Sequence, residues 1–218
     1  MVADYTLVVG TKSWSSWSLR PYVALRATGA AFDEIVVPLR REPETASEIS
    51  KYSPSGKVPA LNVTHDRGRF TVWDSLAICE TLAERHPEAG LWPDDWAARA
   101  RARSYAAEMH SGFADLRDQL PMDFARRKAL PALRETTQSQ IARVIAMWSE
   151  ALASHGDGFL FGRLSVADCM FAPVVSRFVT YGTALPAPLQ DYVARMMALP
   201  AMVDWGRAAQ SEVDAGLG

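Results

Sequence analysis

The first part of the chain carries short apolar runs separated by polar segments, a pattern typical of strands joined by loops and helices. The first run extends from Tyr5 to Val9, and the second ends in Pro38-Leu39. Because proline cannot donate a hydrogen bond to a strand ladder, Pro38 favours an edge position for the second strand. The pattern predicts strands over residues 5–9, 34–39, 60–63 and 69–73, the last two joined by a hairpin turn at 66–68.

Helical periodicity fills the segments between these strands. The first helix is predicted to end near Gly29, because glycine readily adopts the backbone conformation that closes a helix. A polar helix is predicted over 44–52, and a third helix begins at Ser75 and is stopped by Pro87. The order of strands and helices, with a proline before the third strand, predicts an α/β thioredoxin-like domain over residues 1–86.

Beyond residue 95 the pattern becomes helical. The first helical pattern runs without interruption through Tyr105, Met109, Phe113, Leu116 and Leu120. Further helices are predicted around 141–152, from Ser165 onward, and over 188–197 and 201–210. We therefore expect a linker at 87–95 and an all-α helical domain over 96–218.

Ser165 and Asp168 stand three residues apart at the start of one predicted helix, which is the spacing of a capping box. In such a box the acidic side chain accepts a hydrogen bond from the backbone N–H of the first residue. The start of a helix leaves several such donors unpaired. We therefore assign this pair to folding and not to catalysis.

Composition restricts the classes of function. The chain has 218 residues, of which 49% are hydrophobic and 22% charged, and its net charge is −2. This balance provides no basic surface for nucleic acid or membrane lipid, and no apolar run reaches the roughly 18 residues of a membrane span. The first residues lack a signal-peptide pattern, and Cys79 and Cys169 each lie within an apolar helical pattern. We expect a cytoplasmic protein with reduced thiols.

Two motifs within residues 53–75 suit a ligand that is a peptide at one end and an α-amino acid at the other. A cis bond at Val58-Pro59 would leave the Val58 N–H and C=O free to pair with a ligand backbone. Asp74-Ser75 opens a helix, where N–H groups suit a carboxylate and the acid suits an ammonium. Lys57 could bind a second carboxylate. In the plainer interpretation, Asp74-Ser75 only caps the helix and Lys57 is a solvated lysine.

The same stretch resembles the glutathione-binding half of the cytosolic glutathione S-transferase family, in which a Val-Pro dipeptide precedes the third strand and an acidic-Ser pair opens the third helix. The resemblance runs from Thr6 to Asp168. It implies the thioredoxin-like and all-helical domains of that fold, glutathione as co-substrate, and a homodimer. The residues implied in glutathione binding are Lys57, Val58, Pro59, Asp74 and Ser75.

The loop before the first helix offers serines that can activate a thiol. A hydroxyl that donates to sulfur at the positive end of a helix stabilises the thiolate. The run from Ser15 to Arg20 resembles the Ser-Ser-Cys-Ser-Trp-Arg motif of zeta-class transferases, which makes Ser15 the catalytic candidate, with Ser16 and Ser13 as alternatives. Trp17 replaces the cysteine of that motif, which argues against maleylacetoacetate isomerase activity. In the plainer interpretation the serines cap the helix.

A second substrate is expected in an apolar cleft between the domains. The candidates to line it are Trp14, Trp17, Met109, Phe113 and Met122. An apolar stripe at helical spacing also fits plain core packing. His110 lies beside this stripe, but no second side chain stands at metal-ligand spacing, so we predict no metal site.

These features lead to the hypothesis of a glutathione transferase that joins the glutathione thiolate to a small hydrophobic electrophile. A second enzymatic hypothesis is a glutathione-dependent isomerase or dehalogenase of zeta type. A third, from a different class, is a non-catalytic interaction protein with the transferase fold, although the complete set of ligand residues favours a working site. A thiol–disulfide oxidoreductase is disfavoured because the first helix carries no Cys-x-x-Cys motif.

Overall fold

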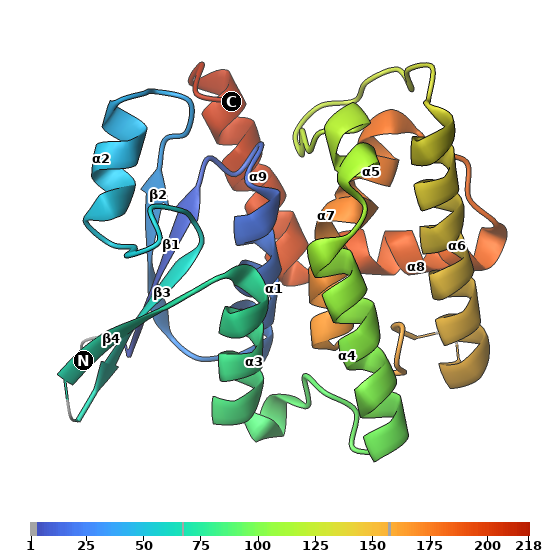
Figure 1. Ribbon diagram of the computed structural model, residues 1–218, viewed down its shortest axis with the longest axis horizontal. Helices are drawn as coiled ribbons and strands as arrows, with labels where there is room; N and C mark the ends of the chain where they lie inside the picture. The colour runs from blue at the N-terminus through green and yellow to red at the C-terminus, as the bar shows by residue number, and fades with distance from the viewer. Residues whose placement is uncertain (1–3, 67, 157) are drawn as a thin grey trace.

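The computed structural model describes residues 4–66, 68–156 and 158–218. A sheet with its covering helices occupies one side of the molecule, and a group of mostly longer helices occupies the other (Figure 1). Residues 1–3, and Arg67 of the predicted hairpin turn, lie outside the described part. The chain forms an α/β part followed by an all-α part, which confirms the predicted fold class.

The strands form one mixed sheet in the order β2-β1-β3-β4. β1 (Tyr5–Gly10) runs parallel to β2 (Phe32–Val37) and antiparallel to β3 (Ala60–His65), which pairs antiparallel with β4 (Gly68–Trp73). The four predicted strands are all present, and β2 is an edge strand as predicted. β2 begins earlier than the sequence pattern indicated and ends before Pro38, which cannot continue the ladder.

The two faces of the sheet are covered by different helices. α1 (Ser16–Thr28) and α3 (Ser75–Arg85) lie on the face toward the helical part, and α2 (Glu44–Ser50) lies on the other (Figure 1). Successive strand residues point to opposite faces. Val8 therefore joins a small cluster with α2, whereas the adjacent Leu7 joins the main core.

A short 3-10 turn, Pro87–Ala89, follows α3 and leads to the helical part. Its helices are α4 (Trp96–Ser111), α5 (Ala114–Gln119), α6 (Glu135–His155), α7 (Val166–Tyr181), α8 (Ala187–Met197) and α9 (Pro200–Asp214). α7 is buried along nearly its whole length and packs against α1 and α4. Within the described ranges, no helix is long and apolar enough to cross a bilayer.

The uninterrupted helix predicted through residues 105–120 is wrong. α4 ends at Ser111, and α5 begins only at Ala114. Gly112 closes α4, and Phe113 has a φ of 61°, in the left-handed region that an α-helix cannot include. The apolar spacing continues across this break because the apolar residues on both sides still face the main core.

Asp168 connects the start of α7 to its surroundings, as the capping box predicted. Its Oδ2 accepts hydrogen bonds from the backbone N–H and the hydroxyl of Ser165, at 2.9 and 2.7 Å. Its Oδ1 accepts from the Leu160 N–H at 3.0 Å and the Tyr192 hydroxyl at 3.1 Å. Burial raises the pKa of the Asp168 carboxyl, and the hydrogen bonds act in the opposite direction. One carboxyl thus joins α7, α8 and the segment before α7.

We expect Asp168→Ala to lower the free energy of unfolding by about 3 kcal/mol, because it leaves buried donors without an acceptor. Chemical denaturation followed by circular dichroism measures this loss. Asp191→Ala, at an exposed position of α8, is the matched control and is expected to cost less than about 0.5 kcal/mol. Equal losses in the two variants would contradict the structural role of Asp168.

Candidate functional site

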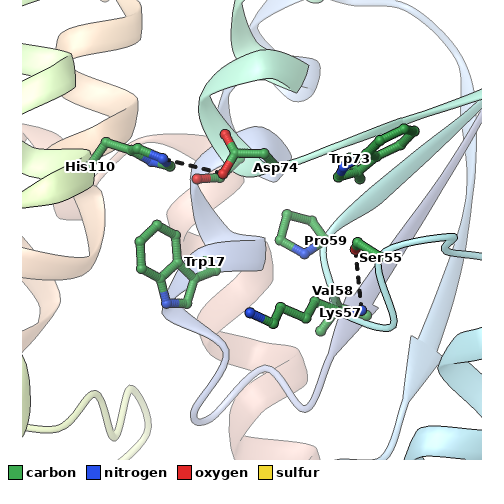
Figure 2. A pocket seen from close by; sticks show the side chains of 9 residues that line it. Trp17, Ser55, Lys57, Val58, Pro59, Trp73, Asp74 and His110 are labelled. Carbon is green, nitrogen blue, oxygen red and sulfur yellow. Dashed lines mark hydrogen bonds and ion pairs between the residues drawn. The ribbon is translucent and has the colours of Figure 1, made fainter.

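A pocket of about 520 Å³ opens where the two parts of the molecule meet (Figure 2). Its walls come from the loop before β3, the end of β4, the starts of α1 and α3, and the end of α4. The lining residues are Trp17, Ser55, Lys57, Val58, Pro59, Trp73, Asp74, Ser75 and His110. All the residues predicted to bind glutathione therefore lie around one cavity.

The loop before β3 brings a cation and a stretch of unpaired backbone to one side of the pocket. The Val58–Pro59 peptide bond is cis. Among the described residues, the Val58 N–H and C=O have no backbone hydrogen-bond partner. Lys57 is exposed, and its side chain extends toward Trp17, while its backbone N–H donates to the Ser55 hydroxyl at 3.3 Å (Figure 2). This side offers a positive charge and a short edge that an extended ligand can pair with.

Asp74 and Ser75 form another wall of the pocket, at the start of α3. Asp74 caps the helix, since its Oδ1 accepts from the backbone N–H groups of Leu76 at 2.9 Å and Ala77 at 3.2 Å. The Asp74 φ of 75° lies in a region that side-chain-bearing residues rarely adopt, so the backbone is strained here. Ser75 is buried, and its hydroxyl accepts a long hydrogen bond of 3.5 Å from Arg20. The capping interpretation is thus correct for one Asp74 oxygen, and the other takes no part in the cap.

His110 occupies that second oxygen from across the pocket. Its Nε2 lies 3.2 Å from Asp74 Oδ2, and its ring stands edge-on to Trp17 with the centroids 5.4 Å apart (Figure 2). The sequence interpretation considered this histidine only as a metal ligand. Nothing in the spacing of α4 indicates that its end meets the start of α3. Ser55 and Trp73 are the other lining residues that the sequence did not single out.

Positive charge is buried beside Trp17. Arg20 is fully buried over the Trp17 ring at 4.2 Å, and its Nε and Nη2 have no hydrogen-bond partner within the described ranges. Burial, together with the charges of Arg177 and Arg117, lowers the pKa of Arg20 to about 9. Burial and Arg117 likewise lower the pKa of Arg177 to about 9. All three guanidinium groups stay protonated at neutral pH, so they favour an anion nearby.

The three candidate serines are buried near the start of α1, and none is among the lining residues. Ser15 makes no capping bond with its side chain; its Oγ donates to the Ser18 Oγ at 2.7 Å. Ser18 Oγ also accepts from the Gly10 N–H at 3.2 Å. The Ser13 hydroxyl donates to a carbonyl of α9 at 3.1 Å. Ser16 is the first residue of α1. The structure therefore does not show the capping role for Ser15 that the plainer interpretation assigns.

Only one residue predicted for the second-substrate cleft, Trp17, lines this pocket. Trp14 lies against the guanidinium of Arg40 instead, at 4.3 Å from the ring centre. The other three belong to the main hydrophobic core: Met109, Phe113 and Met122. Their stripe continues into the core because α4 packs against α7. The pocket therefore has fewer apolar lining residues than the helical spacing of the sequence predicted.

Metal and cysteine chemistry have no support at this pocket. In the part of the chain that the structure describes, no group of three or more His, Cys, Asp or Glu side chains could hold a metal ion. Cys79 and Cys169 are free and buried, and burial raises the pKa of both thiols. Since the thiolate is the reactive form, neither side chain is suited to act as a nucleophile.

A thioredoxin-like domain, a Val-Pro loop and a helical domain that together enclose one pocket define the class of glutathione transferase folds. The family of glutathione S-transferase N-terminal domains matches residues 14–85, and the family of the C-terminal domains matches residues 94–205. The chain belongs to the glutathione S-transferase family.

Individual relatives agree with this assignment. The chain is 30% identical over 185 residues to a maleylacetoacetate isomerase of Pseudomonas aeruginosa, covering 81% of this chain and 82% of that protein. It is 25% identical over 195 residues to a probable maleylacetoacetate isomerase of Caenorhabditis elegans, covering 88% of each. A solved Burkholderia glutathione transferase homolog with bound glutathione is 26% identical, with a TM-score of 0.70 over 95% of this chain and 98% of that one.

The capping role of Asp74 can be separated from its charge. Asp74→Ala is expected to lower the free energy of unfolding by about 1 kcal/mol, because α3 loses its cap. Asp74→Asn retains a capping oxygen and is expected to lose clearly less. Urea denaturation of both variants beside the wild type measures the difference. Equal losses would show that the charge, and not the cap, carries the stability.

Proposed function

We propose that this protein is a glutathione transferase, which binds glutathione in the pocket and joins its sulfur to a small hydrophobic electrophile. One observation carries the proposal: Lys57, the Val58–Pro59 turn and the Asp74–Ser75 helix start surround a single cavity. The glutathione bound in the Burkholderia relative supports the choice of ligand.

The charges of the pocket match the two ends of glutathione. Lys57 binds the glycine carboxylate, and the Val58 N–H and C=O pair with the cysteinyl backbone. The Ser75 N–H, which Asp74 does not cap, and the Ser75 hydroxyl bind the γ-glutamyl carboxylate. Asp74 accepts from the ammonium group, beside His110. Binding at both ends directs the central sulfur toward the start of α1.

The sulfur is activated by a hydroxyl at a positive helix end. A free thiol has a pKa of about 8.5, so little thiolate exists at neutral pH. Ser15 and Ser18 lie 2.7 Å apart, and both hydroxyls can rotate. When Ser18 donates to Ser15, the Ser15 hydrogen is free for the sulfur, and the chain from Gly10 N–H through both hydroxyls polarises each bond. The start of α1 and the buried Arg20 add positive potential.

The thiol proton leaves to solvent, and the sulfur lone pair forms the carbon–sulfur bond with the electrophile. A leaving group departs with its bonding pair, or a proton from solvent quenches the carbanion when the substrate is an activated alkene. Trp17 and Trp73 offer apolar contacts for such a substrate. The non-catalytic alternative would need neither the free Val58 backbone nor an electropositive helix start.

A glutathione-dependent isomerase is the second candidate, favoured by the relatives named maleylacetoacetate isomerase. There the thiolate adds to a double bond, the resulting single bond rotates, and the thiolate leaves as the double bond re-forms. Trp17, at the cysteine position of the zeta motif, argues against it. Incubation with maleylacetoacetate distinguishes the two, because isomerisation leaves the glutathione concentration unchanged and conjugation consumes it.

We also propose a homodimer in the cytoplasm, as the family resemblance implies. Phe70, on the edge strand β4, is 48% exposed and supports a partner surface. Exposed apolar area of this kind commonly marks an interface.

Titration with glutathione at neutral pH, followed by the ultraviolet absorbance of the thiolate, tests the proposed activation. The wild type is expected to give a saturable signal, which Ser15→Ala reduces about tenfold while the affinity measured by calorimetry stays nearly constant. Ser16→Ala and Ser13→Ala serve as matched controls. A signal lost only in Ser16→Ala would move the role to that residue. A wild type that does not bind glutathione would refute the proposal.

The charge of Asp74 is tested by binding. Asp74→Asn is expected to raise the dissociation constant for glutathione about tenfold, because the ammonium loses a charge-assisted hydrogen bond. The cap at α3 remains, so the unfolding temperature should change little. Asp191→Asn removes an exposed charge elsewhere and should leave binding unchanged. Calorimetry measures both constants, and an unchanged value in Asp74→Asn would contradict the assigned contact.

A further inference from the structure

Residues 11–15, called the serine loop below, join β1 to α1, and the backbone of Lys12 and Ser13 within it is bonded to the helical domain. Glu212 Oε1 accepts from the Lys12 N–H at 2.9 Å, and its Oε2 accepts from the Ser13 N–H at 3.0 Å. The Lys12 carbonyl accepts from the Trp205 indole N–H at 2.8 Å, and the Ser13 carbonyl from the Phe124 N–H at 3.1 Å. Every backbone polar group of this dipeptide is therefore bonded to the second domain.

The side chains of the same dipeptide contact both domains. The Lys12 ammonium pairs with Glu34 and lies about 5 Å from the ring centres of both Tyr22 and Trp205. The Ser13 hydroxyl donates to a carbonyl of α9. Lys12 and Ser13 are both buried, so the segment is packed as well as hydrogen-bonded.

The position of Glu212 within α9 is electrostatically unfavourable for a carboxylate. It lies in the last turn, where the helix dipole disfavours a negative charge. The two N–H groups of the loop offset that cost, because a carboxylate that accepts two backbone donors forms charge-assisted bonds. A single side chain thus satisfies two donors that a tight loop would otherwise leave unpaired.

A short hydrogen-bonded turn connects this dipeptide to Ser15, so a shift of the dipeptide would also shift Ser15. The Thr11 carbonyl accepts from the N–H groups of Trp14 at 3.1 Å and Ser15 at 2.9 Å. On the other side, the Thr11 hydroxyl accepts from the Leu39 N–H at 2.9 Å. The loop is therefore attached to the segment after β2 at one end and to α9 in the middle, so the backbone of Ser15 has little freedom to move.

We propose that Glu212 is a positioning residue for thiol activation: by binding the Lys12 and Ser13 N–H groups, it sets the place of the Ser15 hydroxyl. This inference rests on the proposed function, in which Ser15 donates to the glutathione sulfur. Glu212 touches neither the pocket lining nor the reacting atoms. It acts through the loop, so its loss should affect activation more than binding.

Glu212→Gln tests the proposal, because it keeps the shape of the side chain but turns one acceptor into an NH₂ group that faces a backbone N–H. The pKa of protein-bound glutathione is read from thiolate absorbance against pH, and the affinity from calorimetry. We expect the thiol pKa to rise by about one unit toward its free value, which lowers the thiolate fraction at neutral pH. The dissociation constant should change less than about twofold, as expected when only activation is lost.

Asp214→Asn is the matched control, since it removes a charge from the same helix and its carboxylate accepts a hydrogen bond from Gln210 of that helix. A thiol pKa raised in Glu212→Gln and unchanged in Asp214→Asn supports the proposal. A wild-type pKa in Glu212→Gln overturns it, and so does an equal shift in both variants. If the wild type binds glutathione without forming thiolate, the activation step of the proposed function fails first, and this inference with it.

The unfolding temperature of each variant shows whether the fold is intact. Should Glu212→Gln not fold, Glu212→Asp replaces it: this variant keeps the charge but shortens the reach by one methylene. It is expected to raise the thiol pKa by a smaller amount, and an unchanged pKa would overturn the proposal. Exchange of the Lys12 and Ser13 amide hydrogens, measured by NMR, should accelerate in the same variants.

Discussion

Helix α1 lies between the sheet and the helical domain and is packed on both sides. It contacts β1 and α3 within its own domain, and α7 and α9 in the other. The same helix carries Ser15 at its start, Trp17 in the pocket wall and Arg20 in its buried interior. Because protein interiors are close-packed, α1 cannot shift without disturbing both domains. This packing therefore fixes where Ser15, the Trp17 wall of the pocket and the buried Arg20 lie relative to one another.

Positive and negative side chains lie on different walls of the pocket. Lys57 stands on the exposed loop before β3, while Asp74 and His110 meet at the start of α3. Arg20 and Arg177 are buried, and no carboxylate within residues 4–66, 68–156 and 158–218 pairs with either, which is unfavourable for stability. Such strained electrostatics are typical of functional sites, where a ligand supplies the missing anion. Glutathione carries two carboxylates and a potential thiolate, and it matches this distribution of charge.

The helical domain contributes contacts to the pocket and to the serine loop. His110 reaches Asp74 from α4, and Glu212 holds the serine loop from α9. Both proposed reactions begin with the same thiolate, so the roles proposed for these contacts are the same in either one. The two proposed reactions differ in the second substrate, and a few side chains can change the substrate class without altering the fold.

Local patterns in the sequence were sufficient for the strands, most helices, the capping box at Asp168 and the Val58-Pro59 motif, because each depends on residues close together in the chain. Tertiary structure decided the rest. The break at Phe113 leaves the apolar period intact, so spacing could not reveal it. The contacts of His110 with Asp74 and of Glu212 with the serine loop join residues far apart in the sequence. No local period encodes such contacts, because they exist only after the two domains have packed around α1.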